Sequence, residues 1–144
     1  MVFDAQLVLH DGTAITADIT PTSTTRSSGS AVIDLKKTPA NGLDCVMIVG
    51  NDLAEASDTL LVTIQHSASE GSGYEEIARF PTLTKGTNMP GTFKLRFTSN
   101  KTLDGTTARY VRALIDITDD DSGGDFTVSG VEIMLANDAE HEWA

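Results

Sequence analysis

Apolar and polar residues alternate with a period of two along much of this chain. The segment 92–98 is the clearest example, because Phe93, Leu95 and Phe97 are separated by polar or basic residues. In an extended strand, successive side chains point to opposite faces of the sheet. The alternation therefore predicts a β-strand with one face in the core and the other in solvent.

The same pattern predicts eight or nine short strands in all. They come from residues 3–9, 13–20, 31–35, 43–49, 60–66, 74–80, 92–98, 108–118 and 126–135. Turn-forming residues separate these segments, and the Asp11-Gly12 pair between the first two predicts a hairpin. In the last segment the apolar positions change phase at Gly130, which predicts a β-bulge.

Helical periodicity is almost absent. Residues 51–57 begin with Asn-Asp as a cap candidate and continue with Leu-Ala-Glu, which is enough for one helical turn at best. We therefore predict an all-β fold, an antiparallel two-sheet sandwich. The strand number favours a jelly roll of about eight strands over an immunoglobulin-like sandwich.

Length and composition are those of an ordinary globular domain. The 144 residues are 40% hydrophobic and 22% charged, which predicts one domain over residues 1–144, with an N-terminal arm at 1–10 and a short C-terminal tail at 136–144. No apolar run approaches the roughly 18 residues of a membrane span. The single cysteine, Cys45, lies in an apolar stretch and is expected to be a buried hydrophobic residue.

The charge is strongly negative. A formal net charge of −11 disfavours direct binding to nucleic acid and to anionic membranes. Nine of the 21 acidic residues lie between Asp116 and Glu142, as a solvated loop and tail or as a docking surface for a basic partner. The first ten residues lack the basic and apolar regions of a signal peptide, so we expect a protein that is made and kept inside a cell, or inside whatever assembles there.

No catalytic constellation emerges from the sequence. His10, His66 and His141 are too far apart for a zinc motif, and no nucleophile elbow, phosphate loop or dinucleotide fingerprint occurs. The acidic run 119–125 does not fit an EF-hand, so a solvated turn is favoured over an irregular calcium site. We predict no enzyme activity, no cofactor and no metal or catalytic residues.

Three segments are candidates for contact with a partner. Residues 3–9 have the length and alternation to add a strand to a neighbour, although an internal strand would look the same. Residues 20–30 form a polar loop that is either solvated or ordered by binding, and the tail 136–144 carries the one tryptophan. The candidate contact residues are Phe3, Leu7, Leu9, Thr24, Arg26 and Trp143.

The opening segment 3–17, FDAQLVLHDGTAITA, resembles the start of a family of small tailed-phage capsid proteins. In that family a D-x-Q-L-x-L-S-D-x-Q-A-I/V-T opening precedes a polar, Ser/Thr-rich loop. His10 stands here in place of the family's serine, and Gly12-Thr13 stand near its glutamine. Weaker similarity continues at 58–65, 108–112 and 126–133.

The resemblance implies a jelly-roll cement (decoration) protein on the exterior of a virion capsid, made in the host cytoplasm. Its partners would be the major capsid protein and copies of itself, as a dimer or trimer, and the family brings no catalytic residues or cofactor. Two other classes remain open. One is a carbohydrate- or receptor-binding jelly-roll module of a virion, and the other is a small β-sandwich enzyme with a pocket of convergent titratable groups.

Overall fold

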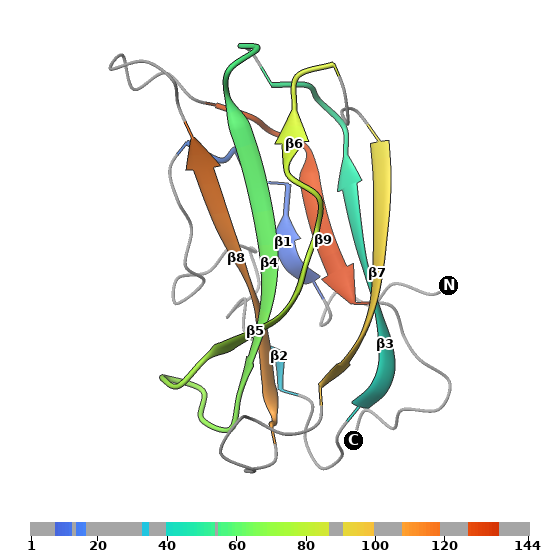
Figure 1. Ribbon diagram of the computed structural model, residues 1–144, viewed down its shortest axis with the longest axis vertical. Coiled ribbons are helices and arrows are strands. Elements are labelled where there is room, and N and C mark those ends of the chain that lie inside the picture. The colour runs from blue at the N-terminus through green and yellow to red at the C-terminus, as the bar shows by residue number, and fades with distance from the viewer. Residues whose placement is uncertain are drawn as a thin grey trace.

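A computed structural model of the protein contains nine β-strands among the residues it describes (Figure 1). The structure describes residues 8–12, 14–16, 33–34, 40–53, 55–86, 91–99, 108–118 and 127–135. In chain order the strands are β1 (Val8–Asp11), β2 (Ile33–Asp34), β3 (Ala40–Val49), β4 (Thr59–Ser67), β5 (Glu75–Arg79), β6 (Leu83–Thr84), β7 (Gly91–Ser99), β8 (Tyr110–Thr118) and β9 (Val131–Leu135). These ranges contain no helix, and so none that could cross a bilayer.

The strands form two antiparallel sheets that face each other. Sheet one has the order β1-β9-β3-β7, and sheet two has the order β2-β8-β4-β5, with the short β6 also paired to β4. Figure 1 shows sheet two in front of sheet one. The prediction of an all-β antiparallel two-sheet sandwich is confirmed.

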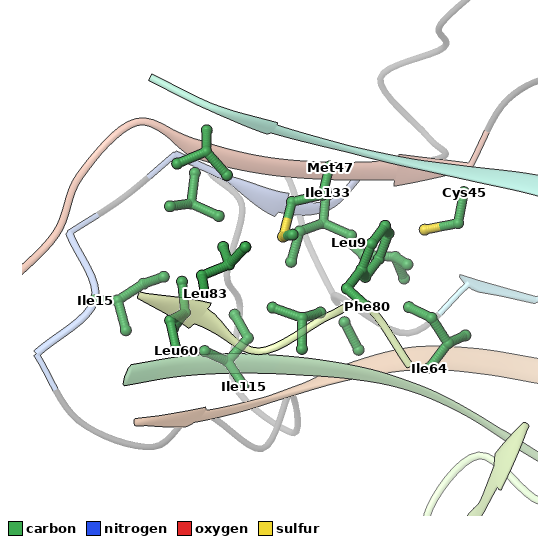
Figure 2. Close-up of a cluster of buried hydrophobic side chains, with 14 of the residues drawn as sticks. Leu9, Ile15, Cys45, Met47, Leu60, Ile64, Phe80, Leu83, Ile115 and Ile133 are labelled. Atoms are coloured by element: carbon green, nitrogen blue, oxygen red, sulfur yellow. The ribbon is translucent and has the colours of Figure 1, made fainter. Parts of the chain in front are cut away.

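Alternating side chains from both sheets fill the space between them. On β4 the inward residues Leu60, Val62 and Ile64 are at most 1% exposed, and β8, β3 and β9 contribute equivalent rows. Figure 2 shows Phe80 between the two layers, surrounded by aliphatic side chains from both. Burial of this apolar surface is the main force that holds the sheets together.

Strand β7 follows its predicted alternation. Phe97 is buried, Phe93 and Leu95 are half-buried against the core, and Lys94 and Arg96 are exposed. The apolar side chains are less deeply buried here because β7 is the last strand in the order of sheet one and pairs only with β3 among the described strands.

Gly12 and Gly130 lie at an irregular point in the pairing of residues 8–15 with residues 128–134. The phase change predicted at Gly130 is confirmed, because Val128 and Val131 are both buried although they are three residues apart. Gly130 has a φ of +77°, a conformation that other residues adopt only at a cost, and its N–H donates to the carbonyl of Gly12 at 3.1 Å. This irregularity lets the strand keep its apolar side chains inward on both sides of the glycine.

The hairpin predicted at Asp11-Gly12 is wrong. Asp11 pairs with Glu132 and Ile15 pairs with Val128, so the chain runs on in one direction along the same partner segment. Gly12 has a φ of +92° and opposes the irregular Gly130 region instead of reversing the chain. The turn-forming dipeptide therefore marks an irregular position within a long pairing.

Other boundaries also differ from those predicted. β3 starts at Ala40, earlier than expected, and β6 was not predicted. In the predicted strand 13–20 the described residues form only the bridge at Ile15, and part of that segment lies outside the description. The described residues of 51–57 form a turn, in which Asp58 N–H donates to the Glu55 carbonyl at 3.3 Å.

The buried thiol of Cys45 gives a direct test of the core. Cys45 is fully buried on the inner face of β3, as the sequence predicted, and this burial raises the pKa of its thiol well above the usual range. Because the thiolate is the reactive species, native protein should not react with a thiol reagent at pH 8. We expect full labelling in denaturant, and rapid labelling of folded protein would contradict the placement.

Candidate interaction surface

A cluster of three side chains stands out on the outer face of sheet two. Arg112 of β8 points outward because its neighbours Val111 and Ala113 point into the core. Gln65 lies directly opposite it on β4, and Arg112 Nε donates a hydrogen bond of 2.8 Å to Gln65 Oε1. With Tyr74, these residues are called here the stacked-arginine cluster.

Tyr74 supports the guanidinium from one side. Its ring centroid lies 3.7 Å from Arg112 Cζ, within the range of a strong cation–π contact. The Tyr74 hydroxyl donates to the main-chain carbonyl of Glu70 at 2.8 Å, which fixes the ring. Arg112 is thus held both at Nε and on one face of its guanidinium.

The loop between β4 and β5 holds Tyr74 in place. Ser67 Oγ donates to the carbonyl of Ser72 at 2.5 Å and accepts from Ser69 N–H at 3.0 Å, so one hydroxyl joins both sides of the loop. Gly73 completes the turn with a φ of +75°. These residues close the turn, and Tyr74 follows it directly, just before β5 begins at Glu75.

One acidic residue beside the cluster, Glu76, is already paired. Glu76, opposite Gln65 on β5, forms an ion pair of 2.8 Å with Arg79. Burial lowers the pKa of Arg112, while Tyr74 acts in the opposite direction, and a guanidinium stays charged at neutral pH. In the part of the chain that the structure describes, no carboxylate is paired with Arg112.

Further polar and aromatic side chains continue this face. Arg109 lies over the ring of Tyr110, with Cζ 5.4 Å from the ring centroid. Thr63 is buried beside Leu114, its opposite neighbour on β8, and its hydroxyl has no hydrogen-bond partner among the described residues. The outer face of sheet two therefore combines arginine, tyrosine and an unused hydroxyl.

His66 and Glu75 form a titratable pair near the inner side of sheet two, apart from the stacked-arginine cluster. His66 is 3% exposed and its Nε2 lies 3.6 Å from Glu75 Oε2. Burial lowers the pKa of His66, and the smaller effect of the Glu75 carboxylate raises it. The net direction is downward, so the folded state favours the neutral imidazole.

Stability should depend on pH through His66. In the unfolded chain this imidazole has its ordinary pKa of 6.5 and takes up a proton more readily than in the folded protein. Its contribution to stability is therefore complete above pH 6.5 and is lost as the pH falls from there toward the lower folded-state pKa. Urea unfolding at several pH values should show this loss.

Two variants separate this effect from general acid destabilisation. His66→Gln should flatten the dependence below pH 6.5. Glu75→Gln should steepen it, because the variant removes the carboxylate that favours the protonated imidazole. An unchanged pH profile in His66→Gln would contradict the assignment.

The contact residues predicted from the sequence are not part of this cluster. Leu9 is 1% exposed and packs in the core, so its side chain is not on the outer surface. The other five, Phe3, Leu7, Thr24, Arg26 and Trp143, lie outside the described residues. The members of the stacked-arginine cluster were not identified from the sequence, although the mixture of arginine and tyrosine in 108–118 was a partial signal.

No metal centre is formed by the residues that the structure describes. Their His, Cys, Asp and Glu side chains do not gather in groups of three or more, and the acidic run 119–125 lies outside them. His10 is buried, with Nδ1 2.8 Å from the carbonyl oxygen of Val131 in the adjacent strand. Its position beside a main-chain carbonyl indicates a structural role.

Comparison with known proteins gives no match: no family model fits the chain, and no curated protein or solved structure is significantly similar to it.

Proposed function

We propose that this protein is a cement (decoration) protein, which binds the outside of an icosahedral phage head and stabilises contacts between capsomers of the major capsid protein. The observation that carries the proposal is the opening segment that resembles such proteins. Its described part forms β1 and the bridge at Ile15, with Leu9 and Ile15 in the core. The described residues of this segment are thus a structural part of the sandwich.

We also infer that the sandwich is a jelly roll. With β6 set aside, the pairs are nested along the chain: β4 with β5, β3 with β7, β2 with β8 and β1 with β9. Strands up to β4 also alternate between the two sheets. This order supports a long antiparallel hairpin rolled into two sheets, the arrangement that a jelly roll requires.

The proposed activity needs only binding. A protein that binds the assembled lattice better than the free capsomer stabilises the lattice by mass action. Many copies on one shell, acting as dimers or trimers, add the benefit of multivalency. A β-sandwich with a broad outer face on sheet two and an edge strand at β1 offers suitable contact surfaces.

Sedimentation with capsids tests the proposal. Purified protein is mixed with expanded, undecorated phage capsids, and the capsids are pelleted. We expect co-sedimentation with saturable stoichiometry and a higher temperature of capsid disruption. Absence of the protein from the pellet, with unchanged heat resistance, would refute the proposed function.

One observation supports a second candidate, a carbohydrate- or receptor-binding module of a virion. Tyr74 and Tyr110 lie with Arg112 and Gln65 on one outer face, and aromatic rings with adjacent polar groups suit sugar recognition. Binding on a glycan array would favour this function. Loss of that binding with a chelator would point to the 119–125 segment as a calcium site, whereas a flat array would argue against the module.

A further inference from the structure

We propose that Arg112 is a recognition site for a carboxylate, supplied by an aspartate or glutamate side chain of a partner protein. The inference deepens the proposed function and rests on it for the partner, the major capsid protein. Its ligand chemistry follows from the geometry of the stacked-arginine cluster alone.

The cluster leaves the ligating end of the arginine unused. Gln65 takes the Nε–H, and the Tyr74 ring covers one face of the guanidinium. The two terminal amino groups make no hydrogen bond to any described residue. Their parallel N–H groups match the two oxygens of a carboxylate, and the fixed side chain loses little further entropy on binding.

The surroundings favour an external carboxylate over an internal one. On β5, Glu76 already forms an ion pair with Arg79, and Glu75 lies beside His66 near the inner side of sheet two. Arg112 is partly desolvated and still lacks a counter-charge among the described residues, although the whole chain has a net charge of −11. A partner carboxylate would supply that charge.

The type of side chain also fits a protein interface. Arginine and tyrosine are among the residues enriched at the energetic centre of protein–protein contacts. This face presents Arg112 beside Tyr74, with Tyr110 two residues away on β8. A polyanion such as nucleic acid would be repelled by the remaining charge of the protein. A single carboxylate on a protein surface avoids most of that repulsion.

Capsid binding by three variants tests the contact. Arg112→Gln removes the charge and should weaken binding to expanded capsids about 30-fold, the loss typical of a central interface residue. Arg112→Lys keeps the charge but not the two parallel donors, and should weaken binding nearly as much. Arg96→Gln is the matched control, because Arg96 lies exposed on the outer face of sheet one, and it should bind as the wild type does.

A measurement without capsids distinguishes the site from the function. The Arg112 Nε–H resonance is followed by NMR in the isolated wild-type protein while sodium acetate replaces sodium chloride at constant ionic strength. We expect a saturable shift of this resonance with acetate.

The outcomes separate cleanly. No saturable acetate-dependent shift would overturn the carboxylate site. An acetate shift with no capsid binding by the wild type would support the site and refute the proposed function. Capsid binding by the wild type and equally by Arg112→Gln would overturn Arg112 as the contact and leave the function standing.

Discussion

Phe80→Ala should lower the free energy of unfolding by about 3–5 kcal/mol. Phe80 is the largest of the fully buried side chains, 1% exposed, and lies between the two sheets (Figure 2). Its N–H also donates to the carbonyl of Val62 at 2.9 Å, so the backbone is held and cannot easily collapse into the space left by the ring. Both the lost burial and the cavity therefore contribute.

Phe93→Ala is the matched control for this prediction. Phe93 is the same residue type in the same core, but it is only half-buried on the edge strand β7. Urea unfolding at 25 °C should show a clearly smaller loss for Phe93→Ala. Equal losses for the two variants would mean that the interior between the sheets is not arranged as described.

Gly130→Ala should lower the free energy of unfolding by about 2–3 kcal/mol. A left-handed backbone costs a non-glycine residue about 1–2 kcal/mol, and Gly130 has a φ of +77°. A Cβ at this position would also lie 2.8 Å from Asn51 Nδ2, which donates a hydrogen bond to the Ser129 carbonyl. Displacing the Asn51 amide would lose that hydrogen bond, worth about 1 kcal/mol.

Gly86→Ala separates these two contributions. Gly86 has almost the same φ, +73°, but nothing lies within 4 Å of the Cβ that alanine would add. Gly86→Ala should therefore lower the free energy of unfolding only by the cost of the left-handed backbone, as measured by the same urea unfolding. A loss at Gly130 no larger than that at Gly86 would contradict the close contact with Asn51.

The sandwich could be predicted because its signals are local. Phe93, Leu95 and Phe97 alternate with polar or basic neighbours over a few residues, and the position of the apolar face of a strand depends only on that spacing. The phase change at Gly130 is local in the same way. Each of these features can be read from a window no longer than the strand itself.

Features that depend on distant partners could not be predicted. Asp11-Gly12 has the composition of a hairpin turn, but pairing of both flanks with residues 128–134 keeps the chain straight. Arg112 and Gln65 are 47 positions apart and meet only through the register of β4 with β8. Tyr74 reaches them because the Ser67 hydroxyl closes its loop, a contact that no sequence pattern shows.

A cryo-electron microscopy map of capsids mixed with this protein tests the central claim most directly. We expect added density for a two-layer β-sandwich on the outside of the shell, at contacts between capsomers, with the Arg112 face of sheet two against the major capsid protein. A map without such density at saturating protein would contradict the account, as would density on the inner surface of the shell.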